Sequence, residues 1–258
     1  MTGPEAVTAI RFAATVSYDG TDFVGSQVQP NGRTVQGELE RAAAAIFGGA
    51  VRVELAGRTD SGVHAIGQVV AFSAATRLEA ATVGRALNAH LADDLAVRDV
   101  RVVGEGFDSR RCARRRWYRY AIWNAEGRSP LCRRTAWHVK GNLDVPAMQA
   151  AARALAGRQD FIACSGPLAA GRTSVRTVFG AGWLRSGEAI LFDIAADAFL
   201  PHMVRRLTGA LVQVGRGQLE EKEFVRLLRQ AEPGSMGPTA PAHGLCLQRV
   251  EYDEGYGQ

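Results

Sequence analysis

The residues best suited to chemistry form a short polar run, residues 56–65, between two apolar stretches. Asp60 lies in the middle of this run, with a glycine on either side. Residues 51–55 alternate between apolar and charged side chains and residues 66–72 are almost wholly apolar, so both flanks are predicted to be strands. Flanking glycines let a short connection hold a carboxylate up from a sheet edge. Asp60 is therefore a candidate nucleophile, although an Asp before Ser-Gly is also typical of a turn-former that binds backbone N–H groups.

A second set of candidates lies in the basic segment, residues 107–140. It holds ten Lys or Arg and two acids, a net charge of +8, which leaves −3 for the rest of a chain whose total is +5. Nearly all of these cations are arginines, which bind phosphate through a planar fork and stack on bases. Tryptophans and tyrosines are interleaved with them, which favours a nucleic-acid partner over a solvated basic face. We expect Arg110 and Arg114 to bind RNA phosphates.

The strand predicted at residues 114–123 places alternate side chains on opposite faces. Arg116 and Tyr118 share one face with Arg114 and Tyr120. Tyr118 either contacts a base or phosphate or is a core tyrosine whose hydroxyl is satisfied.

A helix is predicted at about residues 201–214, with Pro201 in its first turn. His202 and Arg205 would then share one helix face, because they are three residues apart. Arg205 could equally form a surface ion pair, and His202 could be a packed polar residue near the start of the helix.

The elements that must position these residues repeat one order. Strands at 11–18, 51–55, 66–72 and 95–103 and helices at 34–47 and 79–91 give β-α-β-β-α-β in the first half. The second half repeats the order more loosely, with a hairpin at 175–195, an extra helix at 219–231 and a last strand at 245–252. The predicted fold is α+β, with two ferredoxin-like (split βαβ) halves, 1–106 and 107–258, and a cleft between them as the default site.

Composition limits the classes of function. The chain has 258 residues, is 47% hydrophobic and contains no apolar run of membrane-spanning length, so we expect a cytoplasmic globular protein. The four cysteines are far apart and lack metal-ligand spacing, so we expect free, buried thiols and neither zinc nor disulfides. No zinc-deaminase, P-loop or dinucleotide motif is present, which leaves a cofactor-free reaction on RNA. An RNA-binding module of the RRM type is a competing class, weakened by the absence of its RNP signature.

The chain resembles one family, the tRNA pseudouridine synthase A (TruA) family, over nearly its whole length. The matching segments occur in the family's order: residues 18–23 (YDGTDF), 33–40 (RTVQGELE), 57–65 (GRTDSGVHA), 116–120 (RWYRY), 155–157 (LAG), 160–161 (DF), 175–177 (VRT), 199–205 (FLPHMVR), 214–217 (VGRG) and 240–245 (APAHGL).

This resemblance implies a role for several residues. Asp60 would be the catalytic nucleophile, and Tyr118 would lie beside the target base. Arg205 would pair with the aspartate, and Leu245 would pack under the base. Arg58 is part of the same motif as Asp60 and would, with His202, contact the substrate.

The resemblance also implies the fold, the partners and the reaction. Members have two ferredoxin-like halves with antiparallel sheets that form one long sheet, are homodimers, and need neither metal nor organic cofactor. They isomerise uridine to pseudouridine in the anticodon stem-loop, at positions 38, 39 and 40 of the tRNA. The chain departs from the family at Ser26, where tryptophan is usual, at Pro201, where many members have a basic or polar residue, and at Cys164, where an aromatic is common.

The reaction breaks the N1–C1′ bond of uridine, turns the uracil and rejoins it through C5. A carboxylate could act on the ribose, at C1′ or by removing a C2′ proton, or add to C6 of uracil, and the sequence does not choose between these routes. An RNA N-glycosidase that uses the same aspartate remains an alternative, which would release free uracil.

Overall fold

The computed structural model describes residues 8–230 and 232–253 and divides into two compact units. The first unit extends to Arg114 and also includes the chain from Arg249 on, and the second is Arg115–Gln248. The sequence-based division lies earlier, at 106/107. The structure groups the next residues with the first unit because Phe107 is buried in its core and the Ser109 hydroxyl donates to the backbone carbonyl of Glu54 at 2.9 Å.

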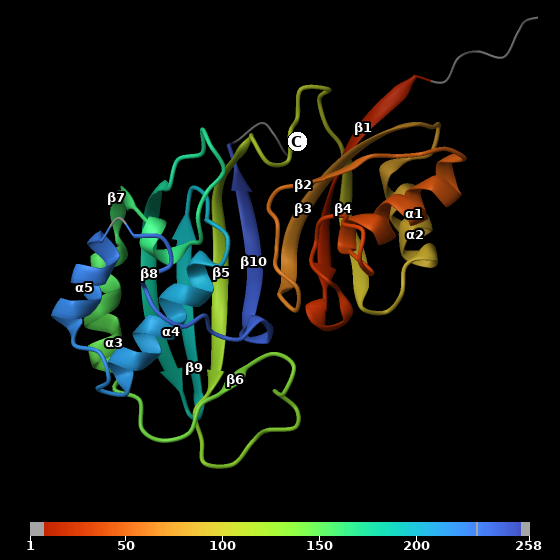
Figure 1. Ribbon diagram of the computed structural model, residues 1–258. Coiled ribbons are helices and arrows are strands. Elements are labelled where there is room, and N and C mark those ends of the chain that lie inside the picture. Colours follow the sequence, from red (N-terminus) through yellow and green to blue (C-terminus); the bar gives the residue numbers. More distant parts are fainter. Residues whose placement is uncertain (1–7, 231, 254–258) are drawn as a thin grey trace, which may run out of the picture. The chain divides into compact units, whose positions relative to one another are not determined.

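The first unit has the predicted order β-α-β-β-α-β. Its elements are β1 (Ala9–Tyr18), a 3-10 turn (Gly20–Asp22), α1 (Val35–Phe47), β2 (Val53–Leu55), β3 (His64–Ala75), α2 (Ala80–His90) and β4 (Leu95–Val102). All strand pairs are antiparallel, in the order β4-β1-β3-β2. Both helices cover the same face of this sheet (Figure 1), so the ferredoxin-like prediction is confirmed for this half.

Local sequence signals set the ends of α1. The Thr34 hydroxyl accepts a hydrogen bond from the backbone N–H of Gly37 at 3.1 Å, as expected of an N-cap. Gly48 ends the helix in the left-handed conformation, with φ of 72°. The buried side chains of α1 then face the sheet.

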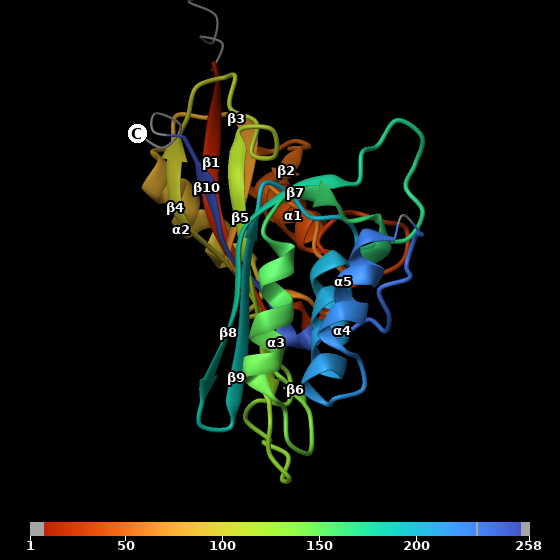
Figure 2. The same cartoon turned by 90° about the vertical axis from the view of Figure 1, so that its left-hand side faces the viewer.

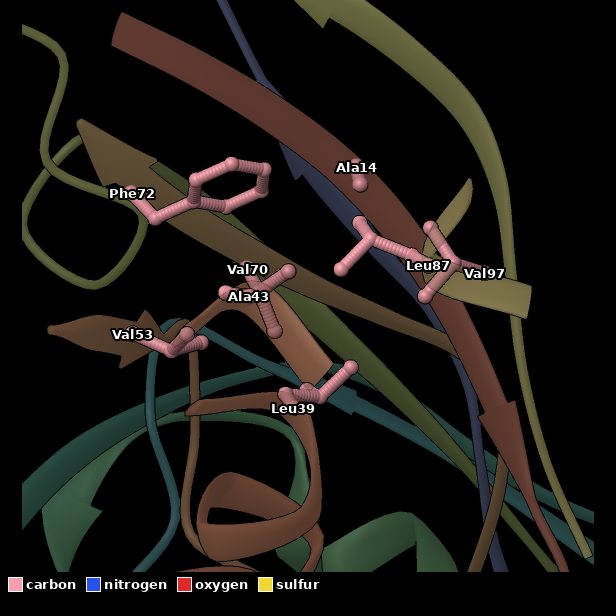
Figure 3. Close-up of a pocket in the computed structure, with 8 residues that line it drawn as sticks. All are labelled: Ala14, Leu39, Ala43, Val53, Val70, Phe72, Leu87 and Val97. Atoms are coloured by element: carbon pink, nitrogen blue, oxygen red, sulfur yellow. The ribbon is translucent and has the colours of Figure 1, made fainter. Parts of the chain in front are cut away.

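The core of the first unit lies between its helices and its sheet. Figure 3 shows side chains from four strands and both helices converging there, and all of them are apolar. The small pocket that they line has no polar group to orient a ligand, so we assign it to the core. The lining residues are Ala14, Leu39, Ala43, Val53, Val70, Phe72, Leu87 and Val97.

The second unit repeats the same order with additions. Its elements are β5 (Ala113–Trp123), β6 (Trp137–His138), α3 (Val145–Ala152), β7 (Gly157–Asp160), β8 (Val175–Ser186), β9 (Ala189–Ala196), α4 (Met203–Gly215), α5 (Glu221–Arg229) and β10 (Leu245–Tyr252), with 3-10 turns at Arg153–Leu155, Ile162–Cys164 and Ala242–Gly244. The first two residues of β5 and the last four of β10 belong to the first unit. The strand order is β10-β5-β9-β8-β7, which matches the first unit with β7 added at the edge, and the short strand β6 pairs with the end of β5. Helices α3 and α4 cover one face of this sheet (Figure 2).

Two features differ from what the sequence predicts. The short strands β6 and β7 were not predicted, because two to four residues carry too little periodicity to be recognised. The four thiols are free, but only Cys164 is fully buried and the other three are half-buried. Burial raises the pKa of the Cys164 thiol to about 12.

Candidate active site

Asp60 lies in the loop that connects β2 to β3, as predicted, and its side chain is half-buried. The backbone N–H of Val63 donates to the carbonyl of Asp60 at 3.1 Å and closes the turn. Gly62, inside this turn, has φ of 79°, a conformation that glycine adopts without strain. Arg58 is exposed two residues before Asp60.

The residue before Asp60 is held by three hydrogen bonds. The backbone N–H of Thr59 donates to the Ser26 hydroxyl at 2.8 Å, and the N–H of Ser26 donates to the Thr59 carbonyl at 3.1 Å. The hydroxyl of Tyr18, at the end of β1, lies 2.9 Å from the hydroxyl of Thr59. Ser26 is fully buried, so these bonds are shielded from water.

Further contacts hold both sides of the loop. The buried Gln68 side chain, on β3, donates to the carbonyl of Gly57 at 2.8 Å, and the Ser61 hydroxyl donates to the carbonyl of Phe23 at 3.1 Å. A Cβ at Gly25 would lie 3.2 Å from the Thr59 carbonyl, and the φ of Gly25 is 118°. The segment after β1 therefore packs directly against the loop, which presents Asp60 on an ordered backbone.

In the second unit, Tyr118 lies on the predicted face of β5. Arg116, Tyr118 and Tyr120 are buried on the helix-covered face, while their neighbours in sequence are more exposed. The ring of Tyr118 meets that of Phe199 edge-on, with centroids 5.1 Å apart. Both are aromatic surfaces of the kind that stack on bases.

The start of α4 differs from the prediction. The helix begins at Met203, because Pro201 and His202 form a turn in which His202 adopts the left-handed conformation, with φ of 61°. The predicted neighbours still meet, since Nη1 of Arg205 lies 3.3 Å from Nδ1 of His202. Nε of Arg205 donates to the carbonyl of Ala240 at 2.8 Å, which ties the helix to the segment before β10.

Leu245 begins β10 and is buried. The turn before it packs on Tyr120, whose hydroxyl donates to the carbonyl of Pro241 at 2.8 Å. A Cβ at Gly244 would lie 2.5 Å from the Tyr120 ring, so only glycine fits there without movement. Burial raises the pKa of Tyr120 and outweighs the opposite effect of the Arg205 charge, so this hydroxyl stays protonated.

The basic segment is partly neutralised by contacts within the protein. Arg114 forms an ion pair with Asp253, with Nη2 and Oδ2 2.6 Å apart. The Asp108 carboxylate accepts bonds from the backbone N–H groups of Arg110 and Arg111, both at 2.8 Å. The Arg110 side chain is exposed. Arg114 is thus a weaker candidate for phosphate binding than its position in the sequence implies.

The structure groups the predicted site residues into two sets. Asp60, Arg58, Arg110 and Arg114 belong to the first unit, and Tyr118, His202, Arg205 and Leu245 belong to the second. The sequence did not assign roles to the residues that hold the Asp60 loop, Tyr18, Ser26 and Gln68. Tyr18 is part of the 18–23 motif, but its contact with Thr59 is decided by the fold, as are the contacts of Ser26 and Gln68 with the loop.

Neither a metal site nor a membrane span is found in the described part of the chain. Residues 8–230 and 232–253 contain no group of three or more His, Cys, Asp or Glu side chains placed to hold a metal ion. No helix in this part is long and apolar enough to cross a membrane.

Comparisons with known proteins match most of the chain to a single family. The family model described as tRNA pseudouridine synthase matches residues 14–110 and 151–253. Proteins named tRNA pseudouridine synthase A from Geotalea uraniireducens and Moorella thermoacetica are 40% and 43% identical, over 92% of this chain and 97% and 98% of theirs. One from Chloroflexus aurantiacus is 44% identical, over 94% of this chain and 89% of its own.

Proposed function

Because this chain belongs to the tRNA pseudouridine synthase family, and thus isomerises uridine in tRNA, we propose that Asp60 is the nucleophile of that reaction. The observation that supports this most directly is the Asp60 loop, whose backbone is bound just before the carboxylate by the buried side chains of Ser26 and Gln68 and is closed after it by the Val63 N–H. An ordered, half-buried carboxylate is preorganised for attack, because little motion is needed to reach the reacting atom.

We propose that the substrate is a uridine of the anticodon stem-loop, the site implied by resemblance to the family. The uridine must leave the base stack before a side chain can reach its glycosidic bond. Tyr118 and Leu245 would contact the extruded base, and Arg58, Arg110, Arg114, Arg205 and His202 would bind the surrounding RNA. Arginine suits this task because its fork binds phosphate oxygens in pairs.

The chemistry conserves the atoms of the base. The N1–C1′ bond breaks, a C5–C1′ bond forms, and the C5 proton is lost while N1 gains one. The carboxylate of Asp60 would attack C1′, remove a C2′ proton or add to C6, and each route leaves it free at the end. These bond changes need no metal or organic cofactor, and we propose that the enzyme uses none.

The proposal is tested with Asp60→Asn and a matched control, Asp93→Asn, in an exposed loop of the same unit. The substrate is an anticodon stem-loop RNA labelled with tritium at C5 of uridine, and tritium release and carbodiimide labelling report pseudouridine. Asp60→Asn should bind RNA normally and lose turnover, while the control retains it. Activity within about tenfold of the parent, equivalent to about 1.4 kcal/mol, would exclude Asp60 as the nucleophile.

The same assay distinguishes a synthase from the remaining alternative, an RNA N-glycosidase. An N-glycosidase would release free uracil, whereas a synthase retains the base in the RNA. We also propose that the protein is a homodimer, as resemblance to the family implies. Light scattering should then give twice the 27.6 kDa of one chain.

A further inference from the structure

Arg176, near the start of β8, carries a half-buried charge that no carboxylate neutralises at close range. Its Nη1 donates to the backbone carbonyls of Thr173 and Val175, at 2.8 and 2.6 Å. Its Nε is buried and has no acceptor. By contrast, Arg33 and Arg119 are each bound directly to an aspartate. Among the described residues, no Asp or Glu forms an ion pair with Arg176.

The carboxylate that most affects Arg176, that of Asp197, already accepts two hydrogen bonds through one oxygen and forms no ion pair with Arg176. Burial lowers the pKa of Arg176, the Asp197 charge raises it by less, and the Arg172 charge lowers it further, so the net shift is downward. One Asp197 oxygen accepts the backbone N–H groups of Thr177 and Ala198, at 3.0 and 2.7 Å. A desolvated guanidinium without its own counterion is costly, and an anionic ligand would remove that cost.

The strand register places Arg176 on the same face of the sheet as Tyr118. Arg116 on β5 and Val178 on β8 both pair with Ala196 of β9, so their side chains share one face of the sheet. Tyr118 is two residues from Arg116, and Arg176 is two residues from Val178, so both lie on that same face. The two steps run in opposite directions from Ala196, because β5 and β8 are both antiparallel to β9 and Tyr118 pairs with Ile194. Arg176 and Tyr118 are therefore about 13 Å apart along the strands and two strands apart across the sheet.

These observations together suggest what the anion is. We infer that Arg176, assisted by Arg172, binds a backbone phosphate of the RNA substrate a few nucleotides from the uridine that Tyr118 contacts. The inference rests on the proposed function, since it assumes an RNA extended past Tyr118. Neither Nε nor Nη2 makes a hydrogen bond within the protein, and Nη2 is the one of the two that is not fully buried, so it is the donor that would meet the phosphate.

The test compares Arg176→Gln with Arg176→Lys, using binding of an anticodon stem-loop RNA at several salt concentrations. Arg176→Gln should weaken binding about tenfold, as expected for loss of one charge-assisted bond. The slope of log K against log salt should become shallower by about 0.7 to 0.9, the value for one phosphate. Arg176→Lys keeps the charge and should keep the slope.

The control is Arg226→Gln, which removes an exposed arginine paired with Glu223 on α5 and should change neither quantity. Thermal unfolding shows whether each variant is folded. If Arg176→Gln does not fold, Arg172→Gln, on an exposed loop, should still lower the slope. An unchanged slope in a folded Arg176→Gln variant, while the parent modifies the RNA, would overturn the phosphate contact alone. A parent that does not modify the RNA would overturn the proposed function.

Discussion

Replacing Ser26 by alanine tests how the Asp60 loop is held. Thr59 N–H donates to the Ser26 hydroxyl, and alanine removes this acceptor from a site with no exposed surface. Leaving a buried N–H unsatisfied costs about 1–3 kcal/mol of folding free energy. For a chain of this size, each kcal/mol lowers Tm by about 2–4 °C. The backbone beside Asp60 should also become less ordered, so kcat should fall more than KM rises.

Urea unfolding and single-turnover tritium release measure the two effects separately. The matched control is Ser73→Ala, because the Ser73 hydroxyl makes only a 3.3 Å bond to Arg11 at the surface and should matter little. A double-mutant cycle of Ser26→Ala with Tyr18→Phe should give a coupling energy above about 0.5 kcal/mol, since both side chains bind Thr59. Parental stability and kcat in Ser26→Ala would refute the idea that this hydroxyl positions the loop.

Three further predictions concern the rest of the molecule. Tyr118→Phe should bind RNA normally but fail to release tritium from C5 if the hydroxyl moves that proton. Tyr118→Leu should lose about 1–3 kcal/mol of RNA-binding free energy, because it removes the aromatic ring. Normal tritium release by Tyr118→Phe would leave only a stacking role for Tyr118. Gly244→Ala should lower the free energy of unfolding by about 1–3 kcal/mol, because its Cβ meets the Tyr120 ring, and an unchanged urea midpoint would contradict this. Burial raises the pKa of Asp108, but hydrogen bonds from the backbone N–H groups of residues 110 and 111 outweigh burial and hold that pKa below its usual 3.8. The ionised carboxylate therefore stabilises the fold above pH 3.8, and this contribution disappears as the pH falls through the lowered pKa. Urea unfolding at several pH values should show Asp108→Ala less stable than the parent above pH 3.8, with the difference vanishing at lower pH.

The amino-acid sequence by itself determined the features that depend on neighbouring residues. Alternation of apolar side chains located β1 and β5, and Thr34 and Gly48 located the ends of α1, because caps and periodicity act over a few residues. The motif around Asp60 was visible for the same reason.

Only the tertiary structure decided features that join distant segments. The bond between Ser26 and Thr59 spans 33 positions, and no local pattern marks it. The left-handed conformation of His202 overrides the preference of Pro201 for a first helical turn. The charge of Arg114 is visible in the sequence, but its pairing with Asp253 depends on the last strand, because ion pairs form wherever folding brings the charges together.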